Sequence, residues 1–148
     1  MTDGWPEVRA MCAIGRRGEL GLGGRMPWEG RREPAFIADV ARFFAATRGH
    51  VLIAGPRTFA SIPPAIAAGR TVVQIRSSME PRATLARFSR RVVYVCGGPT
   101  VWAAYAPWIV HWDITRLPYE GEADRRFDPA WLVAGAPPGE RPGGVDGV

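Results

Sequence analysis

The chain has 148 residues, enough for one domain with a substantial core and too few for two. Its 47% hydrophobic and 22% charged residues are typical of a globular protein, and no apolar run is long enough to cross a bilayer, so no membrane partner is expected. The net charge of +5 comes from arginines scattered in pairs at most, without an RNA- or DNA-binding motif. Nucleic acid is therefore not an expected partner.

Two cysteines, Cys12 and Cys96, lie in apolar runs and are expected to be buried free thiols rather than a disulfide. Nothing in the sequence has the spacing of metal ligands, so no metal is expected. Residues 1–8 carry no secretory signal and are expected to be flexible. Together these features predict a cytoplasmic protein.

Short apolar runs alternate with helical patterns along the chain. A long glycine-rich segment, residues 16–32, is typical of an active-site lid. The alternation predicts a single α/β domain over residues 9–133, with a mainly parallel central sheet and helices on both faces. The Gly/Pro-rich tail, 134–148, is expected to be disordered. The predicted strands are 9–15, 51–54, 71–75, 91–96 and 108–117, and the predicted helices are 34–48, 56–62, 81–88 and 100–106.

Several motifs follow these strands, at the place where open α/β sheets bind ligands. They are Met26-Pro27-Trp28, the helix with Asp39 and Phe43, Gly55 with Arg57 and Thr58, Gly97-Gly98, and Thr115. The order of these motifs over about residues 11–127 resembles the dihydrofolate reductase family. The resemblance implies NADPH-dependent reduction of 7,8-dihydrofolate to 5,6,7,8-tetrahydrofolate by hydride transfer to pterin C6, a step of tetrahydrofolate biosynthesis and one-carbon metabolism.

The resemblance implies that Asp39 is the buried acid that hydrogen-bonds the pterin, and that Phe43, four residues on, packs against the ring from the same helix face. Glu33 is the alternative acid. The family usually places its acid five residues after the motif tryptophan, as Glu33 is, whereas Asp39 follows Trp28 by eleven. The spacing from Asp39 to Gly55 favours Asp39.

The remaining site residues are assigned by the same resemblance. Thr115 is expected to hydrogen-bond the acid, Trp28 to belong to the lid, and Arg70 to bind the folate α-carboxylate. Pro56 stands where a second basic residue is common, which leaves the preference for NADPH over NADH open. Further substrate-binding residues are Ala13 and Ile62, and the cofactor-binding residues are Leu20, Met26, Gly55, Arg57, Thr58, Arg76, Ser77, Gly97, Gly98, Val101 and Trp102.

The C-terminus departs from the family pattern, because the usual final antiparallel hairpin is missing. An uncovered sheet edge is a template for association. We therefore expect either a homodimer contact or a strand within Phe127–Val133 to cover that edge. Two other functions are compatible with the same residues: reduction of another pterin or a pyrimidine, and a catalytically silent module that binds nucleotide or folate.

Overall fold

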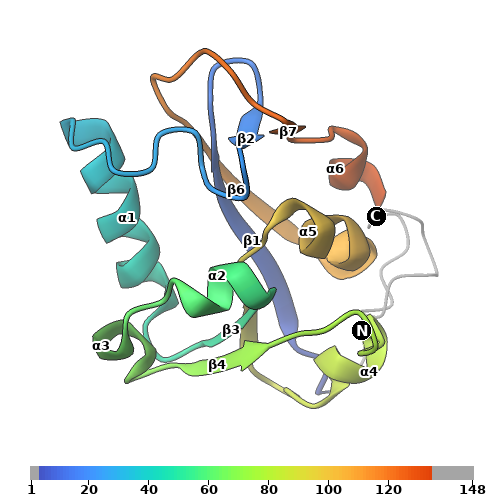
Figure 1. The fold of residues 1–148 in the computed structure, drawn as a ribbon. Helices are drawn as coiled ribbons and strands as arrows, with labels where there is room; N and C mark the ends of the chain where they lie inside the picture. The colour runs from blue at the N-terminus through green and yellow to red at the C-terminus, as the bar shows by residue number, and fades with distance from the viewer. Residues whose placement is uncertain (1–3, 135–148) are drawn as a thin grey trace.

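The computed structural model describes residues 4–134, which are built around one central sheet (Figure 1). Its five strands are all parallel and lie in the order β4-β3-β5-β1-β6. This arrangement confirms the predicted fold class. The strands are β1 (Glu7–Ile14), β3 (Val51–Ala54), β4 (Thr71–Gln74), β5 (Val92–Val95) and β6 (His111–Arg116).

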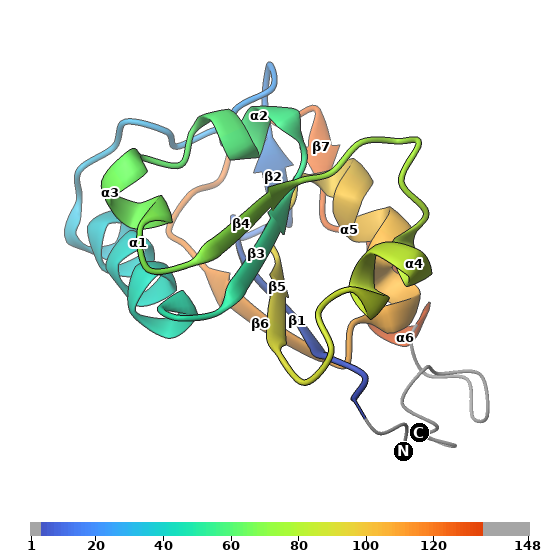
Figure 2. The same cartoon turned by 90° about the horizontal axis from the view of Figure 1, so that it is seen from below.

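Helices cover both faces of the sheet, as predicted. Figure 2 shows α1 (Pro34–Thr47) on one side and α4 (Pro81–Ala86), α5 (Pro99–Tyr105) and α6 (Ala130–Ala134) on the other. Two short helices, α2 (Pro56–Ala60) and α3 (Pro64–Ala67), connect β3 to β4, and a 3-10 turn (Ala106–Trp108) follows α5. Proline opens helices α1 to α5, where its fixed φ and missing N–H cost nothing.

The core is densest at the middle strands of the sheet. All four residues of β3 are fully buried, as expected for a strand with helices on both sides. β1 leads through α1 to β3, whereas its neighbour β5 leads through α5 to β6 in the opposite direction. The carboxyl ends of β1 and β5 therefore form the topological switch point, where open α/β sheets bind their ligands.

The predicted lid segment contains a strand that the sequence did not reveal. β2 (Glu19–Gly21) pairs antiparallel with β7 (Arg125–Arg126), far along the chain. The Gly23 N–H also donates a hydrogen bond of 2.9 Å to Asp124 Oδ2. The loop that carries the Met26-Pro27-Trp28 motif is thus attached to the C-terminal segment.

The prediction of a strand within Phe127–Val133 is wrong, because this segment leads into the helix α6. The Asp128 carboxylate accepts a hydrogen bond from the Ala130 N–H at 2.9 Å, the usual way of starting a helix. Trp131 then stacks on Trp112 of β6, with ring centroids 6.1 Å apart. Within residues 4–134 no second strand covers the outer edge of β6, so the homodimer contact stays a prediction.

The chain ends differ from the expected boundaries in one respect. β1 begins at Glu7, within the segment expected to be flexible, and Trp5 packs against the core. The tail expected to be disordered lies outside the described residues from 135 on. None of the helices described is long and apolar enough to span a membrane.

Candidate active site

Four polar side chains from α1 and β6 meet at one side of the sheet. Asp39 and Arg42 are three residues apart and share a face of α1. Asp113 and Thr115 alternate along β6 and therefore point to the same face. Arg42 joins the two elements by donating to Asp113 Oδ2 at 2.8 Å, to Asp39 Oδ1 at 3.4 Å and to Thr115 Oγ1.

The geometry favours Asp39 over Glu33 as the acid of this site. The Asp39 side chain is only 20% exposed and faces β6. Glu33 precedes α1, is half exposed, and forms an ion pair with Arg31. The hydrogen bond from Arg31 holds the pKa of the Glu33 carboxyl below its usual value, as at a helix entry facing solvent.

Asp39 is not the only carboxylate of this cluster, because Arg42 also donates a hydrogen bond to Asp113. The negative charges of both carboxylates affect the pKa of the buried Cys12 thiol. Burial raises the pKa of Cys12 to about 12, and the charges of Asp39 and Asp113 contribute to this increase. The two predicted thiols are confirmed as free cysteines.

Apolar side chains form two walls near these polar groups. Trp28 is buried and packs on Phe36 at the start of α1 and on Tyr119, with ring centroids 6.3 and 5.6 Å away. Ala13 packs against the same cluster and lies beside Thr115 in the β1–β6 register. Phe43 and Ile62 both pack against a second cluster, formed by Met11, Leu52 and Tyr94. Leu20 belongs to the main core instead, and the Met26 side chain is exposed.

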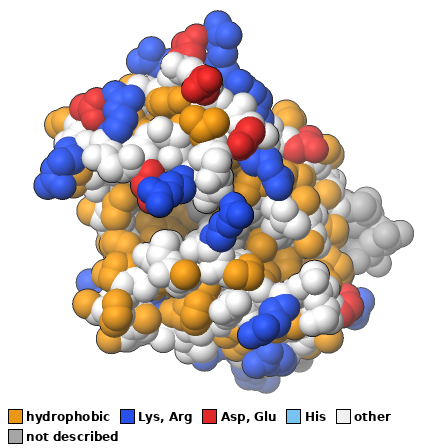
Figure 3. Space-filling model, in the orientation of Figure 1, with side chains coloured by type: hydrophobic (Ala, Val, Ile, Leu, Met, Phe, Trp, Pro, Cys, Tyr) orange, Lys and Arg blue, Asp and Glu red, His pale blue; other side chains and the backbone are white. Residues whose placement is uncertain are grey.

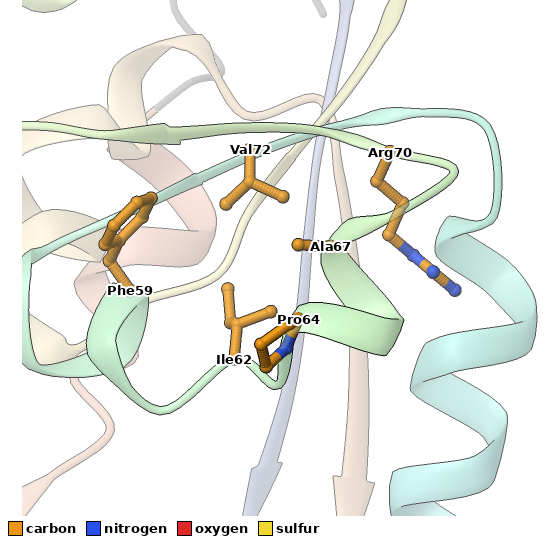
Figure 4. A pocket seen from close by; sticks show the side chains of 6 residues that line it. All are labelled: Phe59, Ile62, Pro64, Ala67, Arg70 and Val72. Atoms are coloured by element: carbon orange, nitrogen blue, oxygen red, sulfur yellow. The ribbon is translucent and has the colours of Figure 1, made fainter.

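Hydrogen bonds from Arg70 link the end of α1 to α3. Its guanidinium donates to Thr47 Oγ1 at 3.0 Å, to the Ile66 carbonyl at 2.6 Å and to the Phe44 carbonyl, which uses three of the five N–H groups of an arginine. Arg70 also borders a cavity of about 440 Å³, and Figure 4 shows its side chain turned away from the others toward α1. The other lining residues are Phe59, Ile62, Pro64, Ala67 and Val72.

The diglycine after β5 is positioned by β3 and by α5. The Gly55 N–H donates to the Gly97 carbonyl at 3.0 Å, and the peptide bond between Gly97 and Gly98 is cis. A Cβ on Gly55 would lie 3.1 Å from Val101, and one on Gly97 would lie 2.8 Å from the ring of Trp102. No described atom lies within 4 Å of such a Cβ at Gly98.

Space is therefore left for a ligand on the Gly98 side only. Trp102 supports the glycines from behind: its ring is buried, and its indole N–H donates to the Val95 carbonyl at 2.9 Å. Trp102 is therefore part of the core beneath the glycines and does not line the open space beside Gly98.

The phosphate-binding residues implied by the resemblance lie where β3 and β4 end. Arg57 and Thr58 open α2, and Arg76 and Ser77 follow β4 on the surface. In the described part of the chain neither arginine forms an ion pair with an acidic side chain. Figure 3 shows arginines around a hollow in this face of the molecule. Free guanidinium groups beside an open glycine backbone fit an anionic nucleotide cofactor.

Two residues of the polar cluster, Arg42 and Asp113, were missed by sequence reasoning. In the sequence alone, each of the two looks like an ordinary charged residue on the surface. The available signal was the spacing of two between Asp113 and Thr115, which puts both on one face of a strand.

A parallel five-stranded sheet with an open diglycine beside its topological switch point is typical of an α/β protein that binds a ligand at that edge. The family model described as "Dihydrofolate reductase" matches residues 7–132, and the chain belongs to that family. It is an oxidoreductase of a type that uses nicotinamide cofactors.

Two curated relatives differ in how similar they are to this chain. One, named dihydromethanopterin reductase, from Methylorubrum extorquens, is 59% identical over 129 residues, which cover 87% of this chain and 96% of that protein. The other, dihydrofolate reductase type 8 from Escherichia coli, is 27% identical over 146 residues, covering 86% of this chain and 83% of that protein.

Proposed function

We propose that the protein reduces a dihydropterin with NADPH and that its substrate is dihydromethanopterin rather than dihydrofolate. The observation that carries the reaction type is the half-buried Asp39 beside Thr115, next to the switch point of the sheet. The choice of pterin rests on the 59% identity to a dihydromethanopterin reductase, against 27% to a dihydrofolate reductase.

In this proposal each side chain has a defined task. The Asp39 carboxylate accepts hydrogen bonds from the N–H donors of the pterin ring, and Phe43 packs against the ring. Trp28 and the loop before it exclude water. The bound nicotinamide supplies the hydride, so the contribution of the protein is orientation and shielding.

The arginines at the strand ends support the choice of NADPH as the cofactor. Arg57 and Arg76, with Ser77, carry forked or hydroxyl donors suited to the 2′-phosphate that distinguishes NADPH from NADH. Neither guanidinium has an ionic partner within residues 4–134, so both remain available to a phosphate. We expect Arg76→Gln to raise KM for NADPH while leaving KM for NADH unchanged.

The proposal is tested by following nicotinamide absorbance with dihydromethanopterin and with dihydrofolate as substrates. We expect kcat/KM for dihydromethanopterin to be higher by at least about tenfold. Asp39→Asn should reduce kcat/KM by on the order of a hundredfold, the usual range for a group that acts on proton transfer or charge in the reaction.

Glu33→Gln is the matched control, because it removes the alternative carboxylate without touching the polar cluster. Full activity in Glu33→Gln with loss in Asp39→Asn is the expected result. Equal rates with both pterins would overturn the choice of substrate, and a fully active Asp39→Asn would overturn the choice of acid.

A further inference from the structure

The Arg42 guanidinium lies between two carboxylates but is not shared equally. Its bond to Asp113 is 2.8 Å long, the ordinary length of a charge-assisted hydrogen bond, whereas its bond to Asp39 is 3.4 Å, near the upper limit for one. It also donates to Thr115 Oγ1, two residues from Asp113 on the same strand face. Arg42 is therefore attached mainly to β6, although it belongs to α1.

This attachment leaves Asp39 largely available. One carboxylate oxygen, Oδ1, has the weak contact with Arg42, and within residues 4–134 the other, Oδ2, accepts no hydrogen bond from the protein. A half-buried carboxylate with an open oxygen gains strongly from a ligand with two adjacent N–H donors. A pterin ring carries such a pair at N3 and the 2-amino group.

An arginine three residues away on the same helix competes with that ligand. A guanidinium has the same paired N–H donors as the pterin edge and forms forked bonds with a carboxylate. If Arg42 turned fully to Asp39, it would occupy both oxygens. The only other acidic group bonded to Arg42 in the described residues is Asp113.

We infer that Asp113 is a positioning residue that holds Arg42 away from Asp39 and so keeps the Asp39 carboxylate open to the pterin. The inference rests on the proposed function, because it assigns Asp113 a part in binding the same substrate class. Asp113 does not touch the reacting atoms. It acts through Arg42, and its effect depends on Arg42 being present.

This dependence gives a test with two backgrounds. Asp113→Leu removes both charge and acceptor at similar volume, and Arg42→Met removes the guanidinium but keeps an apolar stem. We expect Asp113→Leu alone to raise KM for dihydromethanopterin by on the order of tenfold, the worth of about one charge-assisted hydrogen bond, with kcat changed by less than about threefold. In the Arg42→Met background, the same Asp113→Leu change should alter KM by less than about twofold.

A binding experiment makes the test independent of turnover. The dissociation constant of a 2,4-diaminopteridine, which presents the same paired donors, is measured for each variant by quenching of tryptophan fluorescence. Glu122→Gln, an exposed carboxylate change outside the cluster, is the control. The dissociation constant for NADPH should be the same in all variants, which would show that they are folded.

The outcomes separate the two proposals. Wild-type protein that reduces no dihydropterin overturns the proposed function, while the diaminopteridine titration still measures the coupling of Asp113 to Arg42. Equal effects of Asp113→Leu in the two backgrounds, or no effect in either, overturn the inference even if the protein is an active reductase.

Discussion

Gly24, in the loop after β2, lies directly against the guanidinium of Arg57 at the start of α2. A Cβ atom on Gly24 would come within 2.1 Å of Arg57 Nη1. The loop that carries Met26 and the basic residue proposed to bind the cofactor phosphate are therefore in direct contact. We therefore expect a change in the loop to alter the position of the Arg57 side chain.

We expect Gly24→Ala to displace the Arg57 side chain and to raise KM for NADPH by about three- to tenfold. The neighbouring Gly23→Ala is a close control, because both glycines have positive φ, +63° and +83°, but a Cβ on Gly23 meets no atom within 4 Å. Steady-state kinetics with varied NADPH measure the difference. Equal KM values for the two variants would contradict the prediction.

Glu19 is a fully buried carboxylate that ties the loop before β2 to residues near β7. It accepts hydrogen bonds from the backbone N–H groups of Arg17 at 2.8 Å and Gly121 at 3.0 Å. Burial by itself raises the pKa of Glu19, but the hydrogen bonds from Gly121 and Arg17 outweigh it, so the pKa lies below its ordinary value of 4.5. The ionised form is the one that the fold stabilises.

A lowered pKa means that the stabilisation is present above about pH 4.5 and is lost as the pH falls through the folded-state pKa. We expect Glu19→Gln to lower the free energy of unfolding at pH 7 by about 2 kcal/mol, since it weakens two charge-assisted hydrogen bonds. Urea unfolding from pH 7 to pH 3 measures this. The gap between wild type and variant should narrow in acid, and a gap that stayed constant would rule out Glu19 ionisation as its cause.

Trp131 anchors the last described helix to the sheet. Its ring lies 4.9 Å from Phe127, 6.1 Å from Trp112 and 6.3 Å from Trp102 between centroids. We expect Trp131→Ala to lower the free energy of unfolding by about 3 kcal/mol, because it removes a large packed aromatic. Leu132→Ala, at a side chain that is 48% exposed, should change it by less than about 0.5 kcal/mol.

Thermal unfolding and near-ultraviolet circular dichroism measure the loss of Trp131. Size-exclusion chromatography of the wild-type protein tests the homodimer prediction, because within residues 4–134 the edge of β6 away from β1 has no strand partner. A variant with wild-type stability would contradict the anchoring role of Trp131.

The two glycines after β5 are expected to respond differently to alanine. Gly97 has φ of +98° and its Cβ would meet Trp102, so Gly97→Ala should cost about 3 kcal/mol of stability. Gly98 has an ordinary φ of −80° and open space beside it. Gly98→Ala should change the free energy of unfolding by less than about 1 kcal/mol relative to the wild type. It should raise KM for NADPH by about tenfold, because the methyl group enters the space proposed for the cofactor.

Thermal unfolding measures the stability of the two variants, and steady-state kinetics with varied NADPH measure their KM values. A Gly98→Ala variant with unchanged KM would mean that this space is not where the cofactor binds.

The main sheet was predictable because most of its strands are short apolar runs bounded by glycine, proline and polar residues, and helices separate these strands along the chain. The elements that were missed are short, and one of them, α6 with five residues, lies where a strand was expected. β2, α3 and β7 contain three, four and two residues, too few for a period of 2.0 or 3.6 to be visible. They form only through contacts with distant parts of the chain.

The candidate site was predictable to the extent that family spacing identifies Asp39 and the diglycine. Arg42 and Asp113 have no such spacing, and their side chains are 40% and 41% exposed, like ordinary surface charges. What distinguishes them is the hydrogen bond between two elements 71 residues apart in the chain. Contacts of this range depend on the packing of α1 against β6, which local patterns do not contain.

The pairing of β2 with β7 joins the C-terminal segment to the loop that carries the Met26-Pro27-Trp28 motif. Asp124 N–H donates to the Gly21 carbonyl and Phe127 N–H to the Gly18 carbonyl, each at 2.8 Å. A protein cut before residue 124 would retain all five strands of the main sheet and lose these attachments of the loop. In the proposed function this loop excludes water from the pterin, so we expect proteolysis or a fusion near residue 124 to change how fast substrate enters and product leaves.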